Sequence, residues 1–331
     1  MKKDKVKRTK KEKALIAASV FLAVTVLLTV VISDFLVSFA LDSESSFNMN
    51  TVMSLVLQQN GEEGGTMAYS GFTGTEEEKQ WFMDNSEDIY VTSEDGLRLH
   101  AYHIKNENGN GNYALVFHGY TMHAGHMAYS SKHFYELGYN IIVPDARAHG
   151  ESEGRYIGMG WPERRDALCW INQAIEFSPD AQIILYGISM GASTVMNVSG
   201  EEIPANVKAA IEDCGYTSVW NEFKSQLNSM FRLPSFPILN IAAVLAKFRA
   251  GYDLTAASSE EQIKNCKIPT LFIHGSDDVF VPFEMHDVLY NAAVCEKEKL
   301  VIDGAGHAMS SAVNPDLYWS AVDDFIEKHT D

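Results

Sequence analysis

Residues 185–191 read LYGISMG, which places Ser189 between two glycines directly after an apolar run. The preceding residues 182–185 predict a short buried strand, and residues 192–199 predict a helix. A G-x-S-x-G pattern between a strand and a helix is typical of a sharp turn that exposes a serine hydroxyl at the carboxyl end of a sheet. The pattern alone also fits an ordinary glycine-rich loop. A nucleophilic role for Ser189 therefore requires a base and an acid elsewhere in the chain.

An aspartate pair and a histidine follow two later predicted strands, in the order that this motif requires. Residues 277–278 are both Asp and come after the strand predicted at 270–273, and His307 comes after the strand predicted at 300–302. Because the carboxyl ends of parallel strands meet at one edge of a sheet, we expect His307 and one of these acids beside Ser189. Such a set supplies a nucleophile, a base and an orienting acid for acyl transfer.

The same edge offers two backbone donors for an oxyanion. The strand predicted at 113–117 is followed by His-Gly-Tyr, and the backbone N–H of Tyr120 is one candidate donor. The backbone N–H of Met190, directly after Ser189, is the other. Two such donors hold the negative oxygen that forms when a nucleophile attacks a carbonyl group.

Short apolar strands alternate with predicted helices along most of the chain. We expect strands at 88–92, 97–104, 113–117, 140–143, 182–185, 208–212, 270–273 and 300–302. Helices are expected at 130–137, 161–177, 192–199 and 318–328. This alternation predicts an α/β fold with a mainly parallel sheet and helices on both of its faces.

A long stretch between the strands predicted at 208–212 and 270–273 breaks this rhythm, because a plain crossover needs far fewer residues. We interpret residues 216–262 as a helical cap insertion over one edge of the site. Its large apolar side chains either line an apolar pocket or bury the cap against the body, and both alternatives stay open. These side chains are Phe223, Met230, Phe231, Phe236 and Phe248.

The amino-terminal residues combine a basic stretch with a long apolar one. Residues 1–13 carry a net charge of +6, whereas the whole chain carries −18. Residues 14–33 contain no charged side chain and are long enough to cross the hydrocarbon core of a bilayer. We expect a transmembrane signal-anchor over 14–40, with the basic segment in the cytoplasm and the rest of the chain outside. The alternative is a cleaved signal peptide and a secreted protein, because residues 38–40 resemble a cleavage site.

The rest of the chain divides into an expected linker at 41–75, rich in Ser, Asn, Gly and Glu, and a globular domain at 76–331. The acidic charge of this part argues against a nucleic-acid partner, whose phosphates it would repel. The four cysteines form no C-x-x-C pair, so a zinc or thioredoxin-type site is not expected. A disulfide between Cys266 and Cys295 remains possible.

Several motifs together resemble the serine α/β-hydrolase superfamily over about residues 80–330. They are His118-Gly119, the DARAHGESEG loop at 145–154, G-x-S-x-G at 187–191, HGSDDVFVP at 274–282 and Gly306-His307. Within this superfamily the chain resembles the membrane-anchored YqkD-like hydrolases of Gram-positive bacteria, relatives of the Bem46 group. One departure is Ala148, which stands where the superfamily usually has glycine.

This resemblance implies an eight-stranded sheet, no cofactor, and hydrolysis of esters or related acyl bonds. It also implies that Asp278 is the acid that orients His307 in a triad with Ser189. Asp277 and Asp213 remain as alternative acids, since some hydrolases place the acid one strand earlier.

The expected function is therefore that of a serine esterase acting on a small acyl substrate of apolar character at a membrane. The alternatives are a thioesterase, an amidase or peptidase, or a lipase with the same triad, or a non-catalytic binding module of the same fold. His118, His123 and His126 cluster in one loop, but no acid accompanies them at metal-ligand spacing, so no metal is expected.

Overall fold

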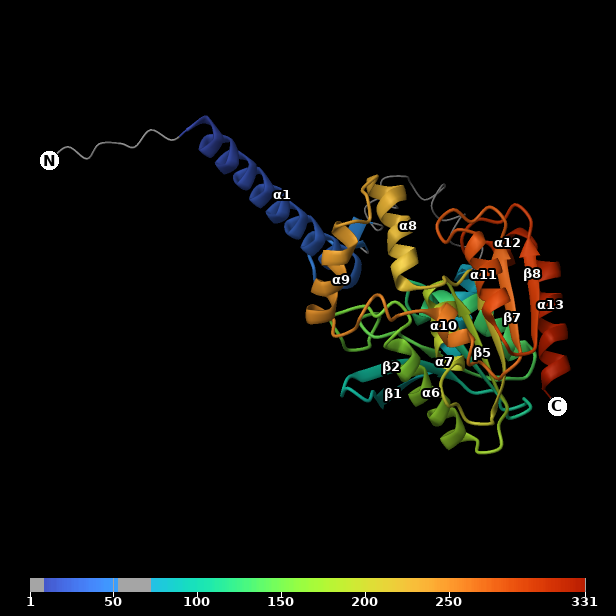
Figure 1. Ribbon diagram of the computed structural model, residues 1–331. Helices are drawn as coiled ribbons and strands as arrows, with labels where there is room; N and C mark the ends of the chain where they lie inside the picture. The colour runs from blue at the N-terminus through green and yellow to red at the C-terminus, as the bar shows by residue number, and fades with distance from the viewer. Residues whose placement is uncertain (1–8, 50, 53–72, 331) are drawn as a thin grey trace.

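The computed structural model describes residues 9–49, 51–52 and 73–330. Its centre is one eight-stranded sheet with the strand order β1-β2-β4-β3-β5-β6-β7-β8 (Figure 1). The strands are β1 (Ser86–Thr92), β2 (Arg98–Ile104), β3 (Tyr113–Phe117), β4 (Asn140–Pro144), β5 (Ile183–Ile188), β6 (Val207–Asp213), β7 (Thr270–Gly275) and β8 (Lys297–Ile302). The predicted α/β fold with a mainly parallel sheet is confirmed.

Strand β2 pairs antiparallel with both of its neighbours, β1 and β4, whereas the remaining pairs are parallel. For the pair of β1 and β2 the reason is their short connection, because a parallel pair needs a crossover of a dozen or more residues. Gly96 lies in this connection with a φ of 89°, a left-handed value that favours glycine. The hairpin therefore closes one edge of the sheet and leaves the parallel strands at its centre.

Successive residues of the central strands face opposite layers of helices. Val116 packs with Phe134 of α5 on one face, and the adjacent Leu115 packs with Trp170 of α6 on the other. The helices of the body are α4 (Glu76–Asn85), α5 (Ala128–Glu136), α6 (Glu163–Phe177), α7 (Met190–Ser199), α10 (Ser259–Ile263), α11 (Glu284–Ala292), α12 (Ser310–Val313) and α13 (Pro315–His329), with a 3₁₀ turn at Ala124–Met127. Both faces of the sheet are covered, which is why its central strands read as continuous apolar runs.

Two further helices, α8 (Val219–Phe231) and α9 (Ile238–Arg249), lie between β6 and β7 in chain order and within the predicted cap. The Ser218 hydroxyl begins α8 by accepting a hydrogen bond from the backbone N–H of Asn221. Apolar side chains of both helices form a third core with residues of the body, among them Leu227, Ala246 and Val281. These helices therefore cover the region in which β5 to β7 end.

The amino-terminal helix α1 (Lys10–Leu41) projects away from the body, and its last turns lie beside α9 (Figure 1). By length and composition α1 can cross a membrane, and no residue of its most apolar stretch is buried. From Ser33 onward the helix contacts the body, and Val37, Phe39 and Leu41 are buried there. The segment predicted to span a membrane therefore ends in turns that are part of the globular core.

The first residues after α1 are hydrogen-bonded to the body. The backbone N–H of Ser43 donates to Arg155 O at 3.0 Å, and the N–H of Ile157 donates to Leu41 O at 2.8 Å. The start of the segment predicted as a linker is thus attached to the body, and residues 53–72 of that segment lie outside the described residues.

Cys266 and Cys295 are free thiols, so the disulfide that the sequence allowed is not formed. Both sulfur atoms lie 3.6 Å from the hydroxyl oxygen of Thr270. The pair therefore contacts one polar group at the start of β7 without a covalent link.

The loop after β4 holds a testable strain. Ala148 has a φ of 63°, in the left-handed region that costs a residue with a Cβ roughly 1–2 kcal/mol. We expect Ala148→Gly to raise the free energy of unfolding by about 0.5–1 kcal/mol, because glycine removes this strain but adds entropy to the unfolded chain. The measurement is urea unfolding of the full chain in detergent.

Ala167→Gly is the matched control for this experiment, because Ala167 is fully buried within helix α6. It should lower the free energy of unfolding by about 1 kcal/mol or more. Destabilisation by both substitutions would show that the backbone at Ala148 is not strained.

Candidate active site

Ser189 occupies a sharp turn between β5 and α7. Its φ of 56° and ψ of −113° lie outside the regions favoured by residues with a side chain. The turn needs glycine on both sides: a Cβ on Gly187 would lie 2.3 Å from Gly191 O, and a Cβ on Gly191 would lie 2.1 Å from Phe117 O. The serine N–H donates to Asp213 O at 2.8 Å. The two glycines of the motif are therefore required by close backbone contact.

His307 lies between Ser189 and Asp278. Its Nε2 is 2.9 Å from Ser189 Oγ, and its Nδ1 is 2.7 Å from Asp278 Oδ2. Asp278 also accepts hydrogen bonds from the backbone N–H groups of Phe280 and Val281, both at 2.9 Å. Since a carboxylate only accepts, Nδ1 carries a proton, and Nε2 of a neutral ring is then free to accept the serine proton. The structure thus brings together the three side chains expected from the sequence.

A second histidine, His274, also contacts Asp278. His274 Nε2 lies 3.2 Å from Asp278 Oδ2 and 3.1 Å from Val281 O. Burial alone would raise the pKa of Asp278, but hydrogen bonds from His274 and His307 outweigh it and lower that pKa to about 2. Asp278 is therefore an ionised carboxylate at neutral pH.

The two alternative acids lie elsewhere. Asp277 is exposed and accepts a hydrogen bond from Ser276. Asp213 is buried and accepts from the hydroxyls of Tyr318 at 3.0 Å and Ser310 at 3.3 Å. Of the three aspartates, Asp278 is the one that is hydrogen-bonded to His307.

The loop that carries Tyr120 runs directly beside the serine. A Cβ on Gly119 would lie 3.6 Å from Ser189 Cβ, so the adjacent N–H of Tyr120 belongs to the same small space. Met190 is the first residue of α7, and its N–H has no acceptor within that helix. The Tyr120 side chain extends the other way, and its hydroxyl donates to Ala40 O at the end of α1 at 2.7 Å. Both predicted oxyanion donors therefore flank Ser189.

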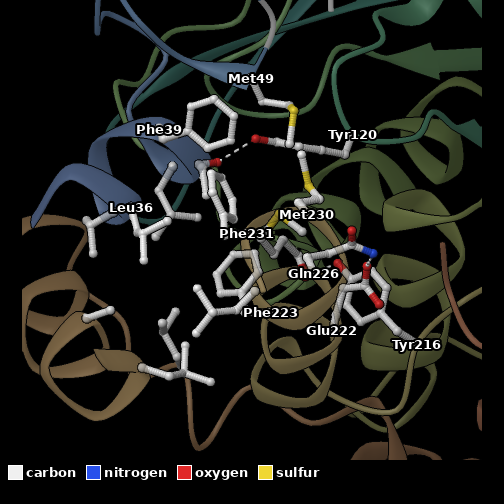
Figure 2. A pocket seen from close by; sticks show the side chains of 18 of the residues that line it. Leu36, Phe39, Met49, Tyr120, Tyr216, Glu222, Phe223, Gln226, Met230 and Phe231 are labelled. Carbon is white, nitrogen blue, oxygen red and sulfur yellow. Dashed lines mark hydrogen bonds between the residues drawn. The ribbon is translucent and has the colours of Figure 1, made fainter. Parts of the chain in front are cut away.

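Ser189 lines an apolar cavity under the cap. Figure 2 shows other side chains of its wall. The cavity encloses about 840 Å³, including the part open to solvent. Of the apolar residues considered for such a pocket, Phe223, Met230 and Phe231 line it. Phe236 and Phe248 do not: they are 76% and 84% exposed, before α9 and on its outer surface, so that part of the expectation is wrong.

Two parts of this cavity were missed by the sequence analysis. The last turns of α1, from Leu36 to Leu41, form one wall, and Met49 adds to it. Glu222 of α8 also lines the cavity (Figure 2). The only signal for the wall was Asp34, a charge within the apolar run that marks the turn where the helix meets the body.

Glu222 is a buried carboxyl group in these apolar surroundings. Its Oε1 accepts a hydrogen bond from Gln226 at 2.8 Å, and its Oε2 has no hydrogen-bond partner among the described residues. Burial raises the pKa of Glu222 to about 8. At neutral pH the group is therefore mostly uncharged, and the cavity wall carries little charge.

One group of potential metal ligands overlaps the triad. Atoms of Cys214, Asp278 and His307 lie within 4.8 Å of one another. Burial raises the pKa of the Cys214 thiol, which keeps it protonated and makes it a poor ligand. His307 Nδ1 and Asp278 are already bonded to each other. This arrangement therefore fits proton transfer better than metal binding.

Glu222 gives a pH-dependent prediction. Between about pH 5 and 8 the unfolded chain has lost the Glu222 proton that the folded protein still holds, so its contribution to stability falls as pH rises. Glu222→Gln removes this effect. Between pH 5 and pH 8, the free energy of unfolding of this variant should rise by on the order of 2–4 kcal/mol relative to that of the wild type. Urea midpoints at the two pH values measure the gain.

The control for this prediction is Glu202→Gln, because Glu202 is exposed. A difference between wild type and Glu222→Gln that stays the same at pH 5 and pH 8 would contradict the prediction.

Comparison with known proteins places this geometry in context. Residues 112–248 match the family model described as serine aminopeptidase, S33. The chain is 27% identical over 265 residues to the uncharacterized protein YqkD of Bacillus subtilis, covering 75% of this chain and 85% of that protein. It is 26% identical over 242 residues to the lysophosphatidylserine lipase ABHD12 of Danio rerio, covering 65% of this chain but only 60% of that protein.

Solved structures show the same architecture. The Pyrococcus furiosus esterase Pf2001 superposes with a TM-score of 0.62 at 22% identity, covering 74% of this chain and 92% of that one. The Pyrococcus horikoshii acylaminoacyl peptidase superposes with a TM-score of 0.55 at 19% identity, covering 74% of this chain and 41% of that one. With the sheet order described above, these likenesses show that the chain has the α/β-hydrolase fold and resembles YqkD-like proteins.

Proposed function

We propose that this hydrolase cleaves carboxylic esters or related acyl bonds with Ser189 as nucleophile, His307 as base and Asp278 as orienting acid. The observation that carries the proposal is the continuous hydrogen-bond relay from Asp278 through His307 to Ser189 Oγ. The esterase among the similar structures supports the choice of an ester, and the peptidase keeps an amide as the second candidate.

The proposed reaction has two steps. His307 Nε2 takes the proton from Ser189 as its oxygen attacks the substrate carbonyl, and the N–H groups of Tyr120 and Met190 hold the oxyanion. His307 then gives the proton to the leaving group, and an acyl group remains on Ser189. Water hydrolyses this ester by the same route, with His307 again as base. Asp278, ionised because its pKa is about 2, keeps the ring oriented and stabilises its cation.

We also propose that α1 is an uncleaved membrane anchor, with the basic residues 1–13 in the cytoplasm and the body outside. The exposed apolar surface of α1 up to Val31 supports this. Cleavage after residue 40 would remove Ala40 O, the acceptor of the Tyr120 hydroxyl, and expose the buried Leu41. These contacts favour the anchor over a cleaved signal peptide.

Hydrolysis of p-nitrophenyl acetate by the full chain in detergent tests the triad. Ser189→Ala should lower kcat by about 10⁴–10⁶, and Asp278→Asn by about 10⁴, because each removes proton transfer while the oxyanion donors remain. Wild type should react with a fluorophosphonate probe, and Ser189→Ala should not.

Asp277→Asn is the matched control, since the two aspartates are adjacent and only Asp278 contacts His307. It should keep activity within about twofold of wild type. Full activity of Ser189→Ala, or greater loss in Asp277→Asn than in Asp278→Asn, would overturn the assignment. Comparing p-nitrophenyl acetate with p-nitroacetanilide separates esterase from amidase activity.

A further inference from the structure

We infer that the end of the amino-terminal helix completes the acyl-binding pocket, and that the substrate is a long-chain acyl ester drawn from the bilayer in which this helix is embedded. The inference rests on the proposed function, because it identifies which acyl group reaches Ser189.

The first observation is that one helix, α1, has an exposed apolar part and a part that lines the cavity. Residues of α1 up to Val31 are largely exposed. Six of the 21 residues that line the cavity come from the end of α1 and the segment after it: Leu36, Val37, Phe39, Ala40, Leu41 and Met49. They share this cavity with Ser189. A substrate at the serine therefore contacts the same helix that we propose crosses the membrane.

The second observation is that this wall is fixed to the rest of the site. The Ser33 hydroxyl donates to Ile238 O of α9 at 2.9 Å. Arg249 of α9 pairs with Asp34 at 2.7 Å and with Asp42 at 3.1 Å.

Asp42 is nearly fully buried and receives a second ion pair from Arg155 at 2.8 Å. A buried carboxylate needs such partners, so separation of α1 from the body would leave an uncompensated charge on one side or the other. The wall is therefore a built part of the pocket.

The third observation is the chemistry of the cavity. The ring of Phe39 in α1 packs edge to face against the ring of Phe231 in the cap, with 5.8 Å between the ring centroids. Met49 and Met230 add flexible apolar side chains to the wall (Figure 2). Among the described residues of the wall, Glu222 alone has a carboxyl group, and that group is mostly uncharged at neutral pH. The lining reaches from Ser189 to Leu36 and Met49, so the cavity extends beyond the groups that an acetyl ester would contact at the serine. These features fit an uncharged hydrocarbon chain.

The fourth observation concerns the source of that chain. Leu36 follows the exposed Val31 by five residues, a rise of about 7.5 Å along the helix, so the pocket lies next to the expected hydrocarbon region. Phe236, just before α9, and Phe248, on α9, are both exposed. Helix α9 lies beside the end of α1 (Figure 1). Exposed phenylalanines are found on the apolar face of helices that lie at a membrane interface. A bilayer amphiphile would therefore meet the pocket without crossing bulk water.

Chain-length dependence in p-nitrophenyl esters from acetate to dodecanoate tests the pocket, with the full chain reconstituted in phosphatidylcholine vesicles. We expect kcat/KM to rise by up to about fourfold for each added methylene until the cavity is filled. Leu36→Ala should lower kcat/KM for the dodecanoate about tenfold and change the acetate less than twofold. Leu36→Trp should shift the optimum to shorter chains.

The matched control is Leu28→Ala, the same substitution on the same helix at an exposed position outside the cavity. It should leave the whole chain-length profile unchanged. A flat profile, or a Leu36→Ala effect that is equal at all chain lengths, would overturn the inference while Ser189-dependent acetate hydrolysis leaves the proposed function intact. Loss of all hydrolysis together with absence of fluorophosphonate labelling would overturn both.

A second arm tests the source. 4-Methylumbelliferyl palmitate is placed either in the vesicles that hold the protein or only in separate vesicles. Supply from the bilayer predicts at least tenfold faster hydrolysis when enzyme and ester share a vesicle. Equal rates would show that the substrate arrives from water and would overturn the bilayer as its source.

Discussion

The close contact between Gly191 and the end of β3 is the constraint on which the site depends. A Cβ at Gly191 would lie 2.1 Å from Phe117 O, so α7 begins against β3 only because this residue is glycine. Next to this contact, Ser189 has a positive φ of 56° and lies beside the loop of Tyr120. The contact requires β3 and β5 to be neighbours, and they pair in parallel through Phe117 and Gly187. The position of Ser189 therefore depends on the order of the strands in the sheet.

The proximity of Ser189, His307 and Asp278 was predictable, because each of these residues follows a strand of the parallel part of the sheet. Ser189, Asp278 and His307 each follow a strand, and parallel strands release their carboxyl ends at one edge. The sequence could not distinguish Asp278 from Asp277 by spacing, since the two residues are adjacent. The distinction comes from the turn itself, in which the backbone N–H groups of Phe280 and Val281 hold the Asp278 carboxylate, whereas Asp277 is exposed.

The pocket was harder to predict, because the sequence pattern of apolar residues is the same whether their side chains face lipid, the protein core or a ligand. Leu36 and Leu28 lie on the same helix, each among apolar neighbours, yet only Leu36 lines the cavity. Phe231 and Phe236 are five residues apart in the cap, and only Phe231 faces inward. These orientations depend on how α8 and α9 pack against α1. That packing is fixed by contacts distant in sequence, such as those of Arg249 with Asp34 and Asp42.

Attachment of α1 to the loop of Tyr120 gives the proposed anchor a role beyond tethering. The Tyr120 hydroxyl donates to Ala40 O, while the N–H of the same residue is a proposed oxyanion donor. Any movement of the helix end would therefore act on the loop beside Ser189 as well as on the pocket wall. A flexible tether would leave the two independent. With the proposed anchor and the proposed oxyanion donor, the hydrogen bond from Tyr120 to Ala40 O would link the position of the helix to the geometry beside Ser189.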